Sequence, residues 1–571
     1  MNIKTGIICL IAIFFHTGLW GKELPRDYFR SPVDFPITLS GNFGELRNNH
    51  FHSGIDIRTF TTGKRVYAAA QGTVSRIKIS AGGYGKALYI DHPNGYTTVY
   101  AHLKSFAPAL ENYILSEQYR RNSFEIDIPV PKNKFVFKKG SLIAYSGNTG
   151  SSAGPHLHFE IRETKSEHPV NPLLFSFKIK DTKAPKIFSL YIYPLDLQSS
   201  INGKKTRQKF SVTYYDNAYH LKGAPKIKLH GKIGFALEAN DYMNDTWSKC
   251  GIYSLQFRVD NELKTEFSIP EFSFAESRYI NSHMDYQLNK QYRKRIHKCF
   301  LAPNNKLSIY KRVKDKGIIH FTDDLTHSLE FKIKDANRNT AILRFKVNSV
   351  STKPQNTTRE FVQVMPYNQS NKFTKDSLEL LLPANCLYDT LYFNYKNQHS
   401  ANTFYSAKHH IHNENTPVHK HFTLGIRPRN LPEKLQDKAL VARIDKRGKL
   451  HNMGGLFFDG WVKTKIREFG NFVITVDTIA PTIRPVKKYK GLNLKQHKRI
   501  EFLIKDELSG IKSYVGEIDG KWVLFEYDAK KNKIFYKFDS KRLKSGQKHS
   551  LKLTITDHKD NKTHYTNHFI W

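Results

Sequence analysis

Five residues in the first third of the chain have the types and spacing of a metal-dependent hydrolytic site: His52, Asp56, His102, His156 and His158. Two histidines and one carboxylate that leave coordination positions open form a catalytic zinc site. Histidines beside such a site are suited to move protons to and from a metal-bound water. The chemistry that this set of residues predicts is hydrolysis assisted by a metal ion.

The pattern around His156 and His158 is typical of a β-strand. Alternate residues of a strand share a face, so these two histidines point the same way. The residues that alternate with them are apolar and would face a core: Leu157, Phe159 and Ile161. We therefore predict a strand with polar chemistry on one face and apolar packing on the other.

The same alternation predicts two more strands. It places His52 and Asp56 on one face, opposite a pair of apolar residues, Ile55 and Ile57. It also places His102 on one face with Tyr100, opposite three apolar residues, Val99, Ala101 and Leu103. A helix would also bring His52 and Asp56 together, but Gly54 and the β-branched neighbours disfavour it.

The stretches that carry these residues resemble the lysostaphin-type (LytM-like) zinc endopeptidases over residues 37–175. The matching motifs are Gly-Asn-Phe-Gly-Glu-Leu-Arg at 41–47, His-Ser-Gly-Ile-Asp at 52–56, Tyr-Ala-His-Leu at 100–103 and the stretch 147–160, which ends in His-Leu-His-Phe-Glu. The resemblance implies an antiparallel β-sheet peptidase domain with one zinc ion. It implies His52, Asp56 and His158 as zinc ligands and His102 and His156 as catalytic residues. None of these five positions departs from the family pattern, so we expect an active enzyme.

Several neighbouring features have two interpretations. His50 shares a face with His52, but the family spacing selects His52 and leaves His50 as a polar residue at the rim. Glu160 either orients the His158 imidazole or forms an ordinary surface salt bridge. The Gly-rich loop 147–155 either forms one wall of a peptide groove or simply connects two strands. The segment 105–134 is an insertion with a predicted short helix over 110–119, and it either shapes substrate access or is a passive excursion.

The start of the chain predicts export. A weakly positive beginning, an apolar run over 7–15 and small residues near 21 are typical of a secretory signal peptide, which we assign to residues 1–21. The apolar run is too short for a comfortable membrane span, and no later stretch reaches that length. Of the cysteines outside this peptide, Cys250 and Cys299 either form a disulfide or stay as buried thiols, and Cys386 has no evident partner.

The chain is strongly basic, with 90 Lys and Arg residues against 51 Asp and Glu residues and a net charge of +39. An exported protein without a recognised nucleic-acid module is not expected to bind DNA or RNA. Peptidoglycan carboxylates, teichoic acids and lipopolysaccharide are anionic groups that would attract such a surface in the bacterial envelope. The alternative is an ordinary solvated basic surface.

After residue 180 the sequence predicts a series of β-sandwich modules. Short alternating runs separated by turn signals replace the earlier pattern, and they weakly resemble bacterial immunoglobulin-like modules. The sequence Asp-Thr-Lys-Ala-Pro at 181–185 recurs as Asp-Thr-Ile-Ala-Pro at 477–481. We predict a peptidase domain over 22–180, a β-sandwich module over 181–350, an uncertain β-rich module over 351–475 and an immunoglobulin-like module over 476–571.

Two other clusters in these modules suggest metal binding only weakly. The histidines within 409–421 lack a carboxylate or cysteine partner, so we interpret them as a solvated hairpin. The Asp and Asn residues at 335–339 and 557–561 lack the ligand density of a calcium loop, so we interpret them as turns.

Together these features predict an exported zinc endopeptidase that hydrolyses peptide cross-links or stem peptides of bacterial peptidoglycan. The β-sandwich modules would position it on the wall or on an envelope protein. Two alternatives stay open. The chain could be a non-hydrolytic regulator that activates a separate wall hydrolase, or a secreted protease that cuts protein targets.

Overall fold

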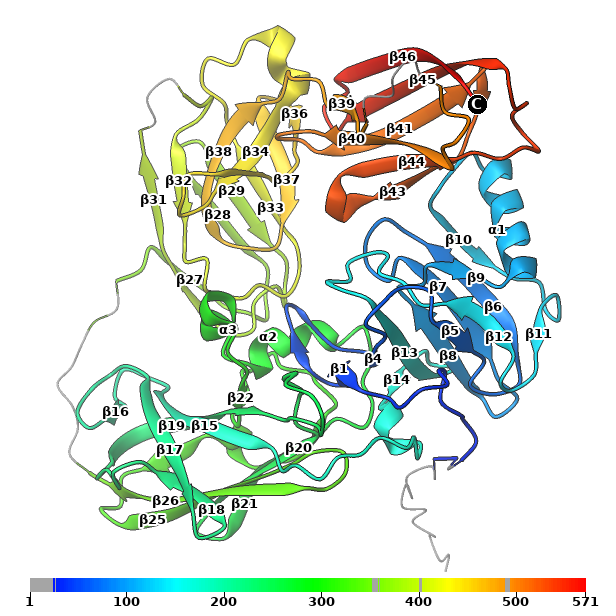
Figure 1. The fold of residues 1–571 in the computed structure, drawn as a ribbon. Coiled ribbons are helices and arrows are strands. Elements are labelled where there is room, and N and C mark those ends of the chain that lie inside the picture. The colour runs from blue at the N-terminus through cyan, green and yellow to red at the C-terminus, as the bar shows by residue number, and fades with distance from the viewer. Residues whose placement is uncertain (1–23, 26, 352–357, 359, 400–402, 488–492) are drawn as a thin grey trace, which may run out of the picture.

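The computed structural model describes the chain except for residues 1–23, 26, 352–357, 359, 400–402 and 488–492. The predicted signal peptide, 1–21, lies outside the described residues. The described chain consists mainly of antiparallel strands, which confirms the expected mainly-β fold. The sheets fall into four successive groups that are arranged as a ring in Figure 1. We call these groups modules 1 to 4.

Module 1 is built on a large antiparallel sheet with the order β1-β4-β13-β8-β7-β6-β10, in which β11 also pairs with β6 and β14 with β13. A small sheet, β5-β12-β9, lies apart from it. The strands of the large sheet are β1 (Leu39–Gly41), β4 (Ile55–Arg58), β6 (Gly72–Ile79), β7 (Lys86–Asp91), β8 (Tyr96–Ala101), β10 (Ile126–Pro129), β11 (Val136–Phe137), β13 (His156–Glu163) and β14 (Pro169–Val170). Those of the small sheet are β5 (Arg65–Tyr67), β9 (Ser105–Phe106) and β12 (Leu142–Tyr145), and β2 (Leu46–Arg47) and β3 (His50–Phe51) form a separate ladder.

The register of β13 brings the predicted site residues together. His158 lies opposite Asp56 of β4 on one side and opposite Ala101, the last residue of β8, on the other. The apolar face of β13 is fully buried, as predicted, because Leu157, Phe159 and Ile161 all belong to the core of this module. Three distant segments therefore meet at one point of the sheet.

Two details of the predicted strands are wrong. The chain is not a strand from His52 to Gly54, because β4 begins only at Ile55. Gly54 packs so closely on β13 that a Cβ atom there would lie 2.4 Å from the Phe159 carbonyl oxygen, so the chain bends at this contact. Likewise β8 ends at Ala101, and His102 has a left-handed backbone with φ of 59°. Tyr100 therefore faces the main core, while His102 turns toward the site.

The insertion forms a helix and an edge strand. Helix α1 (Pro108–Arg120) confirms the predicted helix; it has a proline in its first turn, where no backbone donor is needed, and it buries Leu110 and Ile114. After the helix, β10 adds to the edge of the large sheet beside β6. The insertion is thus part of the module's core rather than a loose excursion.

Module 2 is a twelve-stranded sheet with short helices. Its strands are β15 (Lys186–Pro194), β16 (Ser200–Ile201), β17 (Gln208–Tyr215), β18 (Ala218–Leu221), β19 (Lys228–Asn240), β20 (Ser254–Val259), β21 (Glu262–Ser268), β22 (Ile296–Lys298), β23 (Tyr310–Val313), β24 (Ile319–Phe321), β25 (Thr326–Lys334) and β26 (Thr340–Ser349). Helices α2 (Ile280–His283) and α3 (Tyr286–Tyr292) lie toward modules 1 and 3 (Figure 1).

Modules 3 and 4 each contain a pair of facing sheets. The two five-stranded sheets of module 3 are β28-β29-β33-β37-β36 and β31-β32-β38-β34-β35, with β27 and β30 paired separately. Its strands are β27 (Gln363–Met365), β28 (Asn371–Lys375), β29 (Leu378–Leu382), β30 (Leu391–Phe393), β31 (Tyr395–Gln398), β32 (Lys408–Ile411), β33 (Phe422–Ile426), β34 (Ala439–Ile444), β35 (Leu450–Asn452), β36 (Leu456–Phe458), β37 (Trp461–Ile466) and β38 (Gly470–Val476). Module 4 contains β39 (Thr482–Pro485), β40 (Arg499–Lys505), β41 (Ile511–Ile518), β42 (Lys521–Trp522), β43 (Phe525–Asp528), β44 (Lys533–Lys537), β45 (Lys548–Asp557) and β46 (Lys562–Ile570).

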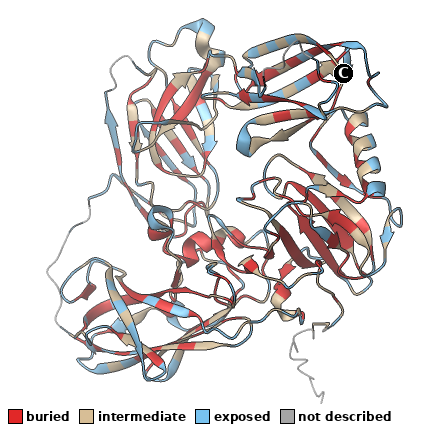
Figure 2. Cartoon of the chain, viewed as in Figure 1, coloured by how far each residue is buried: buried red, intermediate tan, exposed pale blue. Residues whose placement is uncertain are grey.

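Each module has its own buried core (Figure 2). The histidines at 409–412 lie on the predicted hairpin, β31–β32, but not all of them are solvated: His409 is fully buried beside Tyr395.

The three cysteines, Cys250, Cys299 and Cys386, are buried free thiols. Among the helices that the structure describes, none is long and apolar enough to cross a membrane. The predicted boundaries near 180, 350 and 476 stay predictions as domain limits.

The modules contact one another around the ring. Met243 and Cys250 of module 2 belong to the core of module 1, and the Asn42 side chain exchanges two hydrogen bonds with the backbone of Gly251. Module 4 returns to module 1, where the Lys86 ammonium and the Glu526 carboxylate pair at 2.9 Å, with both side chains largely buried. The first and last modules are therefore neighbours in space.

Candidate metal centre

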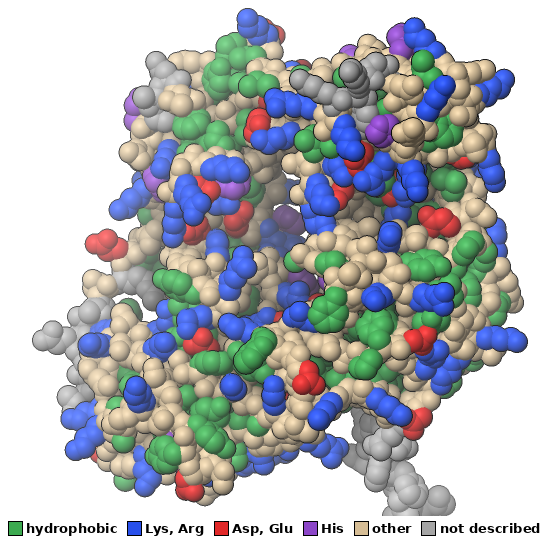
Figure 3. Space-filling model, viewed as in Figure 1, with side chains coloured by type: hydrophobic (Ala, Val, Ile, Leu, Met, Phe, Trp, Pro, Cys, Tyr) green, Lys and Arg blue, Asp and Glu red, His purple; other side chains and the backbone are tan. Residues whose placement is uncertain are grey.

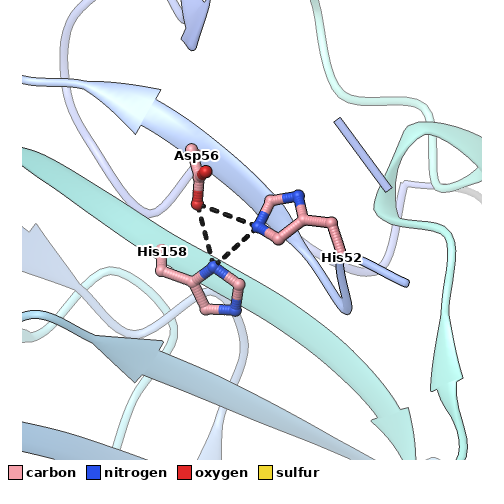
Figure 4. Close-up of side chains that lie close together, drawn as sticks. All are labelled: His52, Asp56 and His158. Carbon is pink, nitrogen blue, oxygen red and sulfur yellow. Dashed lines mark hydrogen bonds and ion pairs between the residues drawn. The ribbon is translucent and has the colours of Figure 1, made fainter. Parts of the chain in front are cut away.

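Three predicted ligands converge on one point of module 1. The Nε2 atom of His52 lies 3.1 Å from Oδ1 of Asp56 and 3.1 Å from Nδ1 of His158, and Nδ1 of His158 lies 2.9 Å from the same oxygen. Figure 4 shows the three side chains pointing toward one another from β4, β13 and the segment before β4. All three residues are buried. The structure thus brings the predicted ligand set together.

The hydrogen bonds of the two imidazoles leave bare nitrogen atoms at the centre. Nδ1 of His52 lies 2.7 Å from the Asn42 carbonyl oxygen, to which only a protonated nitrogen can donate, so Nε2 carries a lone pair. Nε2 of His158 lies 2.7 Å from Glu160 Oε1, which leaves Nδ1 as the lone-pair atom. When both rings are neutral, two lone pairs and a carboxylate oxygen face each other, an arrangement that needs a proton or a metal ion at the centre. Nitrogen and oxygen donors in this number fit Zn²⁺.

The raised pKa of His158 also shows that the site stabilises a positive charge. Burial lowers this pKa, but hydrogen bonds to Asp56 and Glu160 outweigh it and raise the pKa to about 9. The pKa of Asp56 is held well below its ordinary value; burial raises it, but the neighbouring histidines prevail. In both cases the site stabilises a positive charge between the imidazole and the carboxylate, whether a proton or a metal ion supplies it.

Glu160 is the orienting group rather than a surface ion pair. Its side chain is completely buried, and its second oxygen accepts a hydrogen bond of 2.6 Å from Nε of Arg162. The Ser53 hydroxyl donates to Oε1 at 2.6 Å, and the Tyr84 hydroxyl donates to the same atom. These donors fix the carboxylate, which in turn fixes the His158 ring.

Arg47 was not singled out from the sequence as a site residue, but it contacts the predicted ligand Asp56. Its Nη2 atom lies 3.1 Å from Asp56 Oδ2 and 2.7 Å from Glu45 Oε2. One oxygen of Asp56 is thereby occupied, and the other remains directed at the histidines. Arg47 lies within the Gly-Asn-Phe-Gly-Glu-Leu-Arg motif, but nothing in that motif alone indicates which side chain it contacts.

The two further histidines lie beside this centre. Nδ1 of His102 lies 2.9 Å from the Thr149 carbonyl oxygen, and Nδ1 of His156 lies 2.9 Å from that of Gly154. Each Nδ1 therefore donates, and each Nε2 carries a lone pair. The two ring centroids are 4.7 Å apart. Burial, with the charges of His158 and His156, lowers the pKa of His102 to about 3, so this imidazole is neutral near pH 7.

The centre opens into a cleft of about 1380 Å³ between the modules. Its lining includes the site residues, the loop at 151–155, and residues of modules 2 and 3. His50 is exposed and lines this cleft outside the ligand cluster, as predicted for a rim residue. Figure 3 shows Lys and Arg side chains around a hollow between the modules, with histidine side chains in its depth.

The cleft is lined by more basic than acidic side chains. Arg47 and Arg295 both pair with Glu45, and Asp56 belongs to the ligand cluster. Five further basic side chains line the cleft: Arg58, Lys249, Arg278, Arg293 and Arg467. The cleft is therefore suited to a ligand that carries negative charge.

The Gly-rich loop borders the site and is held by module 4. Ser152 contributes a hydroxyl group 3.1 Å from Nδ1 of His156. The Lys530 ammonium donates to the carbonyl oxygens of Asn148 and Ser152, at 2.5 and 2.8 Å. The loop is thus a wall of the cleft as well as a connection, and its anchor lies in a module far along the chain.

Comparison with known proteins identifies two regions of the chain. The model of peptidase family M23 matches residues 50–118 and 124–172, which include all five predicted site residues. A Zu5-like domain model matches residues 362–477, which covers most of the module at 351–475 that the sequence left uncertain. The first match is the family predicted by resemblance.

Curated relatives match stretches that cover about a quarter of the chain. An uncharacterized metalloprotease of Haemophilus influenzae is 32% identical over 160 residues, which are 27% of this chain and 28% of that protein. The DD-carboxypeptidase/endopeptidase Mpg of Neisseria meningitidis is 36% identical over 128 residues, 22% and 23% of the two chains. The peptidoglycan DD-endopeptidase ShyA of Vibrio cholerae is 32% identical over 149 residues, 25% and 28% of the two chains. The alignments thus span about a quarter of the length of these relatives.

Solved structures also align with about a quarter of the chain. A zinc-containing peptidase from Vibrio cholerae aligns with a TM-score of 0.19 and 27% identity, over 26% of this chain and 39% of that one. The catalytic domain of lysostaphin from Staphylococcus simulans aligns with a TM-score of 0.18 and 22% identity, over 24% of this chain and 87% of that one.

Proposed function

We propose that this chain, which carries a domain of peptidase family M23, is a zinc endopeptidase that hydrolyses peptide bonds of bacterial peptidoglycan. The observation that carries the proposal is the convergence of two bare imidazole nitrogens and one carboxylate oxygen at the floor of a cleft. His52, Asp56 and His158 are the ligands of one zinc ion in this proposal. When bound there, zinc supplies Lewis acidity and lowers the pKa of a water molecule toward neutrality.

His102 and His156 are the proton-transfer residues in this proposal. Both present an unprotonated Nε2 to the site, because Nδ1 of each donates to a backbone carbonyl. Such an atom can accept a proton from the attacking water and later donate it to the leaving amine. In its protonated form it also stabilises negative charge on the oxygen of the tetrahedral intermediate. Two imidazoles allow one to accept a proton while the other stabilises charge.

The charge of the cleft supports peptidoglycan as the substrate. Stem peptides carry free carboxylates, and five basic side chains of the cleft have no acidic partner within its lining as the structure describes it. These side chains come from three modules, so modules 2 and 3 would contribute to substrate binding. The name of the Vibrio relative, a peptidoglycan DD-endopeptidase, agrees with this substrate class.

A bacterial envelope location follows from the same proposal. Peptidoglycan lies outside the cytoplasm, so an enzyme that hydrolyses it must be exported, as the residues at 1–21 predict. The basic surface would retain the protein near anionic wall polymers. Modules 2 to 4 would position the cleft on the wall, either directly or through an envelope protein.

Digestion of purified sacculi tests the function. The zinc-loaded full chain should release soluble muropeptides whose masses show cleavage of cross-links or stem peptides, and a His158→Ala variant should release none. Zinc content and the circular dichroism spectrum of each protein show whether a variant is folded and loaded. Loss of release in the variant with an unchanged fold supports the proposal.

Two results would contradict it. Failure of the folded, zinc-loaded chain to cut sacculi would favour the regulatory alternative, particularly if the chain stimulates a separate hydrolase. Efficient cleavage of a protein substrate without cleavage of sacculi would favour the secreted protease.

A further inference from the structure

A second cluster of carboxylates lies where module 2 joins module 1. Oxygen atoms of Asp181, Asp241 and Asp335 lie within 4.8 Å of one another. Asp181 lies in the segment that connects the two modules, Asp241 directly follows β19, and Asp335 directly follows β25. Asp241 and Asp335 are buried, and Asp181 is partly buried. Three carboxyl groups therefore meet in a region with little access to water.

One carboxylate oxygen of this cluster lacks a hydrogen-bond partner, although the carboxylate that carries it accepts a hydrogen bond from the Tyr242 backbone. Asp241 has only 1% of its surface exposed, and its Oδ1 atom has no hydrogen-bond partner among the residues that the structure describes. By contrast, Asp335 accepts two hydrogen bonds from Asn339, and Asp181 accepts one from the Lys183 backbone. An unpaired buried carboxylate oxygen costs free energy unless a cation or a donor meets it.

No ammonium or guanidinium group neutralises the cluster by direct contact among the described residues. The nearest lysine in sequence, Lys183, directs its ammonium to the Met243 carbonyl oxygen at 3.3 Å. Burial and the charges of the other two carboxylates raise the pKa of Asp241 to about 8. Burial likewise raises the pKa of Asp181 to about 6. The arrangement is electrostatically unfavourable without a bound positive charge.

Module 4 repeats the arrangement but satisfies it internally. Asp477, Asp506 and Asp557 also lie within 4.8 Å of one another. Their positions correspond: Asp477 follows module 3, Asp506 directly follows β40, and Asp557 ends β45. In both modules an asparagine four residues after the third aspartate donates to the carbonyl oxygen of the first, namely Asn339 to Asp181 and Asn561 to Asp477.

The two clusters differ at the second aspartate. Oδ2 of Asp506 accepts hydrogen bonds from the backbone of Leu508 and Gly510, at 3.1 and 2.7 Å. Oδ2 of Asp477 accepts another from Ser509. The module 4 cluster is thus satisfied by a short backbone turn. In module 2 that turn is replaced by the loop 242–249, and Asp241 is left with a free oxygen.

We propose that Asp181, Asp241 and Asp335 bind a hard divalent cation, with Ca²⁺ the ion that fits best. The donors are all oxygen atoms, which Ca²⁺ and Mg²⁺ prefer and which suit zinc less well than imidazole or thiolate. Loops supply irregular geometry and backbone carbonyls, which Ca²⁺ tolerates better than Mg²⁺ does. The turn at 335–339, predicted from the sequence, therefore also supplies a ligand.

The bound cation would order one wall of the catalytic cleft. Asp241 pairs with Cys250 through two backbone hydrogen bonds that close the loop 242–249. Ser248 and Lys249 of this loop line the cleft, and Met243 packs in the core of module 1. A cation that joins Asp241 to the connecting segment at Asp181 would fix this loop relative to both modules.

Thermal unfolding of the zinc-loaded full chain with added Ca²⁺ tests the proposal. Saturating Ca²⁺ should raise the unfolding midpoint by about 5 °C, since a ligand that binds only the folded state stabilises it. In an Asp241→Asn variant this rise should disappear. Without Ca²⁺ the same variant should be more stable than the unaltered chain, because it removes a buried carboxyl group that the folded chain can keep only at a cost in free energy, either ionised without a partner or protonated. This reversal of order distinguishes a cation site from simple damage to the fold.

The matched control is Asp506→Asn, which alters the corresponding residue of module 4. It should leave the Ca²⁺-dependent rise unchanged, and calorimetric titration should then show one site that is lost in Asp241→Asn. Three results would overturn the proposal. The unfolding midpoint of the unaltered chain could stay unchanged in millimolar Ca²⁺. The Ca²⁺-dependent rise in the midpoint could persist in Asp241→Asn, or it could be lost in Asp506→Asn alone.

Discussion

Arg47 and Asp56 form an ion pair that leaves one carboxylate oxygen for the metal centre. Nη2 of Arg47 lies 3.1 Å from Oδ2 of Asp56, while Oδ1 of the same carboxylate lies 2.9 Å from Nδ1 of His158. Arg47 is held in turn by Glu45. The guanidinium therefore fixes the rotation of the carboxylate, so that a single oxygen is presented to the proposed metal ion.

Replacing Arg47 with Ala should weaken zinc binding by about 10- to 100-fold, which is the usual effect of losing a group that orients a ligand. The carboxylate would lose its fixed rotation. Competition with a chromogenic chelator measures the affinity. Arg76→Ala, which removes an exposed ion pair with Asp127 on β6 and β10, is the control and should leave zinc affinity unchanged. An equal loss in both variants would show that the effect is not local.

Glu160→Gln should lower zinc affinity by a similar factor of about 10 to 100. The amide keeps the shape of the side chain but removes the negative charge that polarises the His158 ring and that Arg162 neutralises. A zinc titration followed by calorimetry measures the change. Glu163→Gln, three residues further along β13, is the matched control. Unchanged affinity in Glu160→Gln would mean that His158 needs no carboxylate to hold its tautomer.

His102→Asn should reduce the turnover number by about 10²- to 10⁴-fold while zinc content stays the same. The side chain lies beside the ligand cluster but is not part of it, so its loss should affect proton transfer rather than metal binding. Release of muropeptides and metal analysis are the two measurements. His50→Asn at the rim of the cleft is the control. If His102→Asn also loses zinc, the residue is part of the metal site instead.

Lys530→Ala should loosen the Gly-rich loop without altering the metal centre. The ammonium donates to two carbonyl oxygens of this loop, and the same loop supplies the hydroxyl group beside His156. Hydrogen exchange of the amides in 147–155 should become faster, and kcat/KM should fall several-fold. Lys531→Ala, whose ammonium lies nearest Asp528 of its own module, is the control. Exchange that is unaffected by Lys530→Ala would show that module 4 does not hold the loop.

Stability should decline as the pH falls from 6.5. Burial lowers the pKa of His297 to about 3 and holds that of His283 well below its ordinary value, so both stay neutral in the folded chain near pH 6. The unfolded chain binds protons at these residues below pH 6.5, which favours unfolding increasingly down to about pH 3. Above pH 6.5 they make no contribution to the pH dependence.

Thermal midpoints between pH 4 and 8 measure this effect. A His297→Gln variant should show a shallower decline below pH 6.5, because it removes one group that titrates only on unfolding. His568→Gln, at an exposed position of β46, should not change the slope. Identical slopes for the unaltered chain and His297→Gln would contradict the assignment.

The sequence predicted the strand that carries His156 and His158 correctly, because a fully alternating pattern specifies both the strand and its buried face. It did not predict the conformation of His102. Alternation placed this residue on an extended strand, but its backbone is left-handed. Its amide bonds to the Tyr84 carbonyl oxygen and its ring to that of Thr149, and neither contact is visible in the local pattern. A local pattern cannot show a turn that a distant loop stabilises.

The groups that orient the ligands were predicted only in part. Glu160 was recognised as a candidate because it shares a face with His158. Arg47 and Tyr84 were not, since their contacts depend on how separate segments meet across the sheet. The same limit applies to Asp241, which joins Asp181 and Asp335 only in the folded chain.

The contacts of Lys530 with Asn148 and Ser152 have a consequence for the order of assembly. The partners are separated by 382 and 378 positions, so closing this contact has a large entropic cost and must wait until nearly the whole chain has been synthesised. Among the described residues, the buried core of module 1 extends to Cys250 and otherwise includes Leu524, and three partly buried aromatic residues of module 4 pack against it at its edge: Tyr514, Trp522 and Tyr527. A nascent chain can therefore complete the metal centre well before its loop is anchored. The newly made protein would pass through a stage in which the cleft exists but is still open on one side.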